Sequence, residues 1–271
     1  MVTITDIEFT QLAKYIKAHY GINLKEEKKM LIIGRLHNVL AELNFDNFSQ
    51  YYQYLISDKT GNAVNTLVNK ITTNHTYFMR EKNHFDYLKE KVLPNIMPMV
   101  KDRDLRLWCA GCSSGEEAYT LAMIIDQFCQ EKKLWWDKKI LATDISDKVL
   151  THAKKGIYQK EQIMPLPEVW KKEYLKKLDD NNFIFSDKIK SEILYRRFNL
   201  MEKTFPFNKK FHVIFCRNVM IYFDMNTKNE LINKFYNSME YGGYLFIGHS
   251  ESLSGQKTGF KYVMPSVYRK E

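Results

Sequence analysis

The stretch LWCAGCSSGEEAYTLAM, residues 107–123, decides the fold. Together with the preceding residues it predicts a strand and a turn over 104–111, and small residues continue the turn to Gly115. From Glu116 onward, apolar side chains recur at helical spacing. A buried strand joined by a tight turn to a helix is the repeating unit of α/β proteins with a parallel sheet. We therefore predict an α/β domain whose turn lets a ligand approach the backbone closely.

The alternation of strand and helix continues to the C-terminus. The α/β pattern predicts a mostly parallel seven-stranded sheet covered on both faces by helices. A closing hairpin around Pro265 is typical of methyltransferases rather than of dinucleotide dehydrogenases. The further predicted strands are KKILATD (138–144), LYRRFNL (194–200), HVIFCRN (212–218), GGYLFIGH (242–249), FKYVM (260–264) and SVYRK (266–270).

Residues 157–192 interrupt this rhythm. They are polar and basic, with a helix-like part at 167–178 and a strand-like part at 182–185. We predict an inserted, β-containing subdomain here, within a methyltransferase-like domain that spans 104–271.

The first 73 residues predict a small all-helical domain. Thr5 and Glu8 have the spacing of a capping box, which satisfies the first free amides of a helix, and Gly21 is a plausible helix end. Residues 74–103 are predicted to be a linker and a further helix that ends near Pro94.

Composition and charge narrow the functional classes. The 271 residues are 45% hydrophobic and 14% aromatic, which suits a globular protein with a sizeable core. A net charge of +9 favours an acidic partner, which can be nucleic acid, an anionic membrane or an acidic protein face. There is no apolar run of roughly 20 residues, and the N-terminus does not resemble a signal peptide. We expect a cytoplasmic protein without membrane insertion.

The cysteines do not form a convincing metal motif. Cys109 and Cys112 make a C-x-x-C, but neither Cys129 nor Cys216 completes a second pair. We interpret all of them as ordinary buried or loop thiols rather than zinc or redox groups, and we predict no metal.

Two carboxylates stand at the start of the helix that follows the glycine turn. A dinucleotide would place its pyrophosphate there, and Glu116 and Glu117 would repel it. The same charges suit the ammonium and sulfonium groups of S-adenosylmethionine, which favours a methyl donor over NAD. The alternative is that both glutamates only stabilise the positive end of the helix dipole.

Polar residues also follow the other predicted strands, at the sheet edge where α/β proteins bind ligands. Asp144 can accept hydrogen bonds from ribose hydroxyls; the alternative is a helix cap, with Asp144 or Ser146 as the capping residue of the next helix. Asn199 can read an adenine edge and Leu200 can pack on the ring, although a turn residue and a core leucine explain them as well. Arg217 and Asn218 are candidate ligand contacts, with a buried structural ion pair as the alternative.

The segment NHTYFMRE, residues 74–81, lies between the helical domain and the sheet domain. Domain junctions commonly hold ligand clefts, and this one combines aromatic with hydrogen-bonding side chains. The alternative is a hinge that buries Tyr77 and Phe78 in the interface.

Taken together, these motifs resemble the chemotaxis receptor methyltransferase family, CheR. The matching segments occur in the family's order and span most of the chain, and the helical domain and the insertion match its layout. The segments are NHTYFMRE (74–81), WCAGCSSGEEAYTLAM (108–123), ATDIS (142–146), FNL (198–200), IFCRNVMIYF (214–223) and GHSESL (248–253).

The resemblance implies S-adenosylmethionine-dependent O-methylation of glutamate side chains on chemotaxis receptors, with S-adenosylhomocysteine as product. It implies that Arg80 and Tyr222 stand closest to the transferred methyl group and are the catalytic residues. The family often has proline where Ala118 stands and an aromatic residue where Met79 stands. The cofactor contacts that it implies are Asn74, Thr76, Arg80, Glu117, Asp144, Asn199, Leu200, Arg217 and Asn218.

Two other classes remain as alternatives. A nucleic-acid methyltransferase would use the positive charge and the abundant tyrosine and phenylalanine, but the basic residues are spread among helices. The fourth strand also ends in CRNV rather than in the N/D-P-P-F/Y tetrad of amino-methylating enzymes. A non-catalytic module would have a degraded site, whereas the site residues look intact.

We expect a monomer that binds an acidic helical face of the receptor rather than nucleic acid. The resemblance indicates two regions that could contact the receptor. Lys25, Lys28, Lys29 and Arg35 lie on one predicted helix of the N-terminal domain. Some family members grip a receptor tail peptide with glycine-rich loops in the insertion, and residues 177–194 contain no glycine. We therefore predict that this chain does not depend on a tail peptide.

Overall fold

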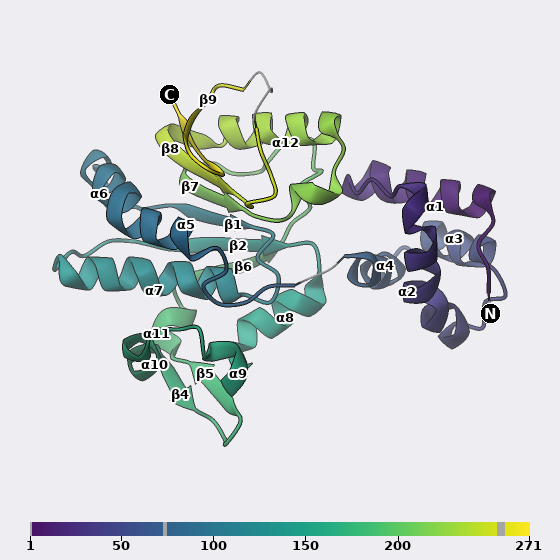
Figure 1. Cartoon of the computed structure of the whole chain (residues 1–271), viewed down its shortest axis with the longest axis horizontal. Helices are drawn as coiled ribbons and strands as arrows, with labels where there is room; N and C mark the ends of the chain where they lie inside the picture. The colour runs from purple at the N-terminus through teal and green to yellow at the C-terminus, as the bar shows by residue number, and fades with distance from the viewer. Residues whose placement is uncertain (1, 73–74, 254–257) are drawn as a thin grey trace.

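The computed structural model describes residues 2–72, 75–253 and 258–271. Its centre is a seven-stranded sheet with the order β6-β2-β1-β7-β8-β10-β9, in which only β10 runs against its neighbours (Figure 1). This confirms the predicted mostly parallel α/β fold with its terminal hairpin. The strands are β1 (Leu107–Ala110), β2 (Ile140–Asp144), β6 (Ile193–Arg197), β7 (Phe211–Cys216), β8 (Met239–Ile247), β9 (Phe260–Met264) and β10 (Val267–Lys270).

Both faces of this sheet are buried, which explains why its central strands are apolar throughout. Leu107 and Cys109 of β1 pack into one core cluster, and Trp108 and Ala110 pack into the other. The first face is covered by α7 (Glu116–Glu131) and the second by α12 (Met225–Asn237), with α8 (Asp147–Lys155) following β2 (Figure 1).

The helix predicted after the junction continues past Pro94. It consists of α5 (Lys82–Tyr87), a π-helical turn η2 (Leu88–Val92) and α6 (Leu93–Ile96), followed by the 3-10 turn η3 (Met97–Met99). Proline has no N–H, and its ring clashes with the carbonyl four residues earlier in a regular helix. Here the Leu93 N–H bonds to the Leu88 carbonyl, five residues back, so the regular hydrogen-bond pattern of the helix is already shifted at Pro94.

The N-terminal region is helical, as predicted. The capping box of Thr5 and Glu8 is present, and Gly21 ends the first helix with a φ of 70°. None of the helices in the described part of the chain is long and apolar enough to cross a membrane. The helices are α1 (Asp6–Tyr20), the 3-10 turn η1 (Glu26–Lys28), α2 (Lys29–Glu42), α3 (Phe48–Ser57) and α4 (Asn62–Ile71).

The region at 157–192 forms a separate small sheet with the order β3-β5-β4, next to α7 and α8 (Figure 1). This confirms the β-containing insertion. Its elements are β3 (Ile157–Gln159), α9 (Lys160–Ile163), α10 (Glu168–Tyr174), β4 (Leu175–Lys177), β5 (Asn182–Phe185) and α11 (Asp187–Lys190).

The end of α1 is attached to the sheet domain through main-chain contacts. Ile22 forms an antiparallel β-bridge with Phe223, and the Asn23 N–H donates to the Tyr222 carbonyl at 2.8 Å. Lys17 pairs with Asp224, with 2.6 Å between Nζ and Oδ2. The helical region therefore lies directly against the segment that follows β7.

Candidate functional site

A cavity lies at the carboxyl ends of β1, β2 and β7, where the strand order reverses and open α/β sheets bind ligands. Its empty volume is about 1060 Å³, including space open to solvent. Asn74 lies outside the described residues. The predicted site residues that line the cavity are Thr76, Arg80, Glu117, Asp144, Asn199, Leu200, Arg217, Asn218 and Tyr222.

The glycine turn forms part of the cavity wall. Gly111 has a φ of 92°, and a Cβ at this position would lie 2.5 Å from Cγ2 of Val219. The N–H groups of Gly111 and Cys112 donate to the Thr143 carbonyl at 2.8 and 2.9 Å, which ties the turn to the end of β2. Glycine is therefore required here both for its conformation and for its lack of a side chain.

Asp144 stands beside this turn at the end of β2. Its carboxylate accepts the Ser113 N–H at 2.9 Å and the Ser146 N–H at 3.0 Å. Burial raises the pKa of Asp144 despite these two bonds. The cap of α8 is the Ser146 side chain, which accepts the Val149 N–H at 3.3 Å, so the alternative role as a helix cap belongs to Ser146.

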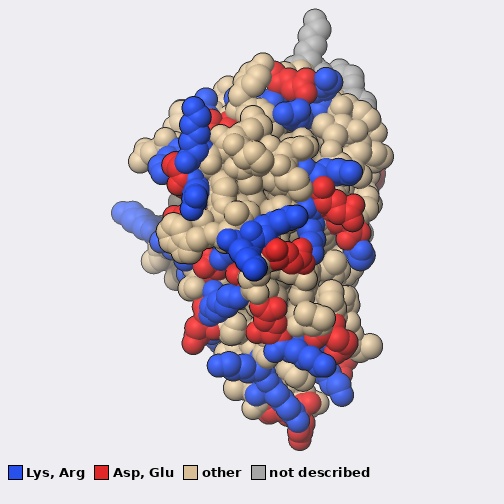
Figure 2. Space-filling view, turned by 90° about the vertical axis from the view of Figure 1, so that its left-hand side faces the viewer, with Lys and Arg blue, Asp and Glu red and all other residues tan. Residues whose placement is uncertain are grey.

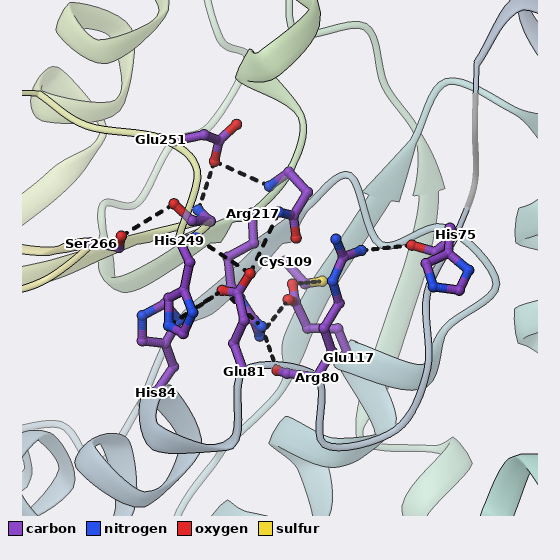
Figure 3. Close-up of polar contacts among 12 residues, drawn as sticks. His75, Arg80, Glu81, His84, Cys109, Glu117, Arg217, His249, Glu251 and Ser266 are labelled. Carbon is purple, nitrogen blue, oxygen red and sulfur yellow. Dashed lines mark hydrogen bonds and ion pairs between the residues drawn. The ribbon is translucent and has the colours of Figure 1, made fainter.

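Arg217 occupies the centre of a buried ion network (Figure 3). Its Nη1 lies 3.0 Å from Oε2 of Glu117, its Nη2 lies 3.2 Å from Oε2 of Glu81, and it also donates to the Arg80 carbonyl. Although burial alone raises the pKa of Glu81, the guanidinium of Arg217 holds that pKa below its usual range. Arg217 therefore forms the buried ion pair that was the alternative to a ligand contact, and it also lines the cavity.

The two glutamates at the start of α7 face different surroundings. Glu117 lines the cavity, and the Cys109 thiol donates to its Oε1 at 3.0 Å. Glu116 is buried away from the cavity lining and accepts the Ser114 hydroxyl at 2.7 Å. Successive helical side chains point about 100° apart, since there are ~3.6 residues per turn, so the expectation that both carboxylates meet the ligand is corrected to Glu117 alone.

Arg80 and Tyr222 line the cavity from two segments far apart in sequence. The Arg80 Nη1 donates to the His75 carbonyl at 2.6 Å, and its guanidinium lies 5.9 Å from the Tyr77 ring centroid. The main chain of Tyr222 is held by Asn23, as described above.

Asn199 and Leu200 contribute the wall next to the helical region. The Asn199 amide donates to the His19 carbonyl at 2.8 Å and accepts the Met201 N–H at 3.0 Å. Leu200 is buried and apolar beside it.

Several residues at the site were not predicted from the sequence as site residues. Tyr20 and Ile22 of the helical region line the cavity, and Glu81 and Glu251 bond to the segment that follows β7. Both glutamates lie inside motifs that the sequence singles out, NHTYFMRE and GHSESL, yet only the fold shows what they contact.

His84 and His249 lie together beside Glu81, with 4.7 Å between their ring centroids (Figure 3). Oε2 of Glu81 lies 3.4 Å from Nδ1 of His84 and 3.9 Å from Nε2 of His249. These side chains have the atom types of metal ligands, but the same Glu81 oxygen is already paired with Arg217. Burial and the nearby guanidinium lower the pKa of His84 to about 4, so it is neutral at pH 7.

The cysteines are all buried and free, and none joins a potential metal cluster among the described residues. Burial raises the pKa of the Cys109 and Cys112 thiols well above the usual range. A raised pKa leaves less of the nucleophilic thiolate at neutral pH.

The charges of the site fit S-adenosylmethionine. Glu117 lines the cavity, and its carboxylate suits the ammonium and sulfonium groups of this cofactor, while Arg217, its ion-pair partner, and Arg80 also line the cavity. Asp144 stands at the second strand end, where α/β sheets place the acceptor for ribose hydroxyls. With the glycine turn and the terminal hairpin, these features define an S-adenosylmethionine-dependent methyltransferase.

Sequence comparisons specify the family. The CheR methyltransferase SAM binding domain matches residues 74–268, and the CheR methyltransferase all-alpha domain matches residues 7–72. The chain belongs to the CheR methyltransferase family. It is 44% identical to a chemotaxis protein methyltransferase of Borreliella burgdorferi, over 99% of this chain and 96% of that one. It is 31% identical to chemotaxis protein methyltransferase Cher2 of Pseudomonas putida, over 96% of both chains.

Proposed function

We propose that this methyltransferase transfers methyl groups to glutamate side chains on the cytoplasmic signalling domains of chemotaxis receptors. The observation that carries the proposal is that Arg80 and Tyr222 share the cavity with the Glu117–Arg217 pair. A cation and a phenol at the cavity wall suit an anionic acceptor. We further propose the domain division made from the sequence, with residues 1–73 as the helical domain and 104–271 as the catalytic domain.

The acceptor needs no general base, since a glutamate side chain has an ordinary pKa of ~4.3 and is an anion at neutral pH. S-adenosylmethionine supplies an electrophilic methyl group on a positively charged sulfur. The protein must orient the carboxylate and exclude water, which supplies much of the rate enhancement. We assign Arg80 to positioning the carboxylate and Tyr222 to orienting it by a hydrogen bond. The negative carboxylate and the positive sulfonium neutralise each other during the transfer. A strong ion pair to the carboxylate would therefore stabilise the ground state more than the transition state.

The test is radiolabelled methyl transfer to receptor cytoplasmic fragments and to RNA, followed by mild base. Label that is transferred to receptor and released by base marks carboxyl methyl esters. Base-stable label on RNA would support the nucleic-acid alternative instead. On the face shown in Figure 2, basic and acidic side chains are interspersed and form no continuous basic stripe, which does not favour a phosphate-tracking surface there.

Arg80→Ala and Tyr222→Phe should each lower kcat about 10- to 100-fold, while S-adenosylhomocysteine affinity changes less. The expected loss corresponds to removal of one hydrogen bond to the reacting carboxylate, at ~1.5–3 kcal/mol. Saturation kinetics with receptor fragments and calorimetry with the product cofactor measure the two quantities. Normal kcat with weakened cofactor binding would show that these side chains only hold the cofactor.

The expectation that Lys25, Lys28, Lys29 and Arg35 lie on one helix is corrected: α2 begins at Lys29, Lys28 belongs to the 3-10 turn η1, and Lys25 precedes that turn. Arg35 donates to the Ile71 carbonyl at 2.6 Å and so supports the end of α4, and Lys29 pairs with Asp6. Lys25 and Lys28 are exposed, and they form no ion pair among the described residues. We propose that these two lysines contact the acidic receptor face.

Reversing Lys25 and Lys28 to glutamate should therefore raise KM for receptor and leave cofactor affinity unchanged. The effect should shrink as salt rises, since salt screens surface charges beyond ~10 Å at 0.1 M. Receptor methylation measured across a salt series tests this. The matched control is Lys132→Glu with Lys133→Glu, the same charge change after the C-terminus of α7. If both double variants raise KM for receptor equally, the overall net charge of the protein explains the effect, and the proposed contact by Lys25 and Lys28 is wrong.

The insertion supports the proposed independence from a receptor tail. Its two edge strands, β3 and β4, have three residues each, and β4 presents Lys176 and Lys177 as exposed side chains. Short edge strands with lysines disfavour the addition of another strand. Receptors with and without their C-terminal tail should be methylated at rates within about twofold, since tethering acts through effective concentration. A large rate loss for tail-less receptor would contradict this.

A further inference from the structure

The segment after β7 brings Arg217, Asn218 and Tyr222 to the cavity. It has little regular structure: Asn218 has a φ of 58°, and the only element is the 3-10 turn η4 (Met220–Tyr222). A non-glycine residue in the left-handed region is uncommon and must be held there by its surroundings. The conformation of this segment therefore depends on hydrogen bonds from elsewhere.

Glu251 supplies these bonds. The side chain is 7% exposed and lies after β8, where the chain approaches the segment (Figure 3). Its Oε2 accepts the Asn218 N–H at 3.1 Å and the Gly248 N–H at 2.6 Å, and its Oε1 accepts the Ile221 N–H at 3.0 Å. One carboxylate thus holds the segment at two points and ties it to the end of β8.

Gly248 brings the two main chains close enough for this arrangement. A Cβ at Gly248 would lie 2.8 Å from the main-chain nitrogen of Asn218 and 2.5 Å from its Nδ2. No side chain fits there unless the segment moves. The Ser266 hydroxyl donates to the Gly248 carbonyl at 3.1 Å, which fixes the other side of the contact.

We propose that Glu251 is a positioning residue for methyl transfer, which holds the segment Arg217–Tyr222 in the conformation that binds the cofactor and aligns the acceptor. The main-chain groups of Asn218, Ile221 and Gly248 that bond to it are all N–H donors, and an ionised carboxylate has only acceptors to offer them. An amide of the same shape would turn an NH₂ group toward one of these donors. The proposal concerns the methyltransferase activity and holds whichever acceptor is methylated.

The experiment compares Glu251→Gln with Asp126→Asn. Asp126 is also a buried carboxylate with several donors, among them Tyr174 at 3.0 Å and Lys188 at 2.6 Å, but it does not line the cavity. Hydrogen exchange by mass spectrometry should show faster exchange in peptides covering 217–223 in the Glu251 variant alone. Calorimetry should show S-adenosylhomocysteine affinity falling about ten-fold in that variant, the loss expected if only about a tenth of the molecules keep the segment in the binding conformation.

Wild-type exchange and affinity in Glu251→Gln would overturn the proposal. So would faster exchange spread evenly over the sheet, because Glu251 would then stabilise the fold without positioning this segment. If Glu251→Gln does not fold, Gly248→Ala tests the same contact with the carboxylate retained. It should produce the same local increase in exchange and the same loss of affinity, and unchanged values would again overturn the proposal.

Discussion

Replacing Arg217 with methionine should lower the apparent free energy of unfolding by about 3–5 kcal/mol, the usual cost of breaking a buried ion pair by removing one partner. The variant leaves Glu81 and Glu117 together in the site without the guanidinium that neutralises them. Urea unfolding followed by circular dichroism measures the loss. Cofactor binding should fall as well, because Glu117 loses the group that fixes its position.

The matched control is Arg197→Met. Arg197 forms a surface pair with Asp147, with 3.3 Å between Nη1 and Oδ2, and its side chain is 45% exposed. Exposed pairs contribute ~0–1 kcal/mol, so this variant should unfold close to wild type. Adding Glu81→Gln to Arg217→Met should recover part of the lost stability, because it removes one of the two unpaired charges. A double variant less stable than Arg217→Met would contradict the ion network.

Asp144→Ala should weaken S-adenosylmethionine binding at least ten-fold. The substitution removes charged hydrogen bonds worth ~1.5–3 kcal/mol each, and a tenfold change in affinity corresponds to ~1.4 kcal/mol. It also removes the acceptor that holds the Ser113 N–H, so the glycine turn loses a support. Calorimetry on the folded variant measures the affinity.

Asp144→Asn separates these two contributions, because it keeps the shape and one acceptor oxygen. Ser146→Ala serves as the local control: it removes the cap of α8 and should cost about 1 kcal/mol of stability with little change in affinity. Unchanged cofactor affinity in folded Asp144→Ala would reject the ribose role.

The sequence predicts this fold well because its signals are local. The glycine turn before Glu116, the apolar strands and the capping box at Thr5 each act within a few residues, and each is present in the structure. The candidate residues also gather in one cavity, since the carboxyl ends of parallel strands share one edge of the sheet.

What the sequence could not predict is pairing over long distances. Glu81 and Arg217 are separated by 136 residues, and nothing near either one specifies the other. The same holds for Glu251, whose role depends on how closely Gly248 approaches Asn218. Glu116 and Glu117 are adjacent in sequence, and the sequence alone does not show which of the two carboxylates faces the cavity. The orientation of α7 about its axis decides this.

The β-bridge between Ile22 and Phe223 has a consequence for recombining parts of related enzymes. A crossover placed after Thr72 would combine the helical region of one parent with the cavity of another, and would divide this bridge between the two parents. The bond from Asn23 to the Tyr222 carbonyl would be divided in the same way. These main-chain bonds can form with any side chains, whereas the ion pair between Lys17 and Asp224 depends on residue identity, so chimeras designed to exchange receptor preference need these two residues from the same parent.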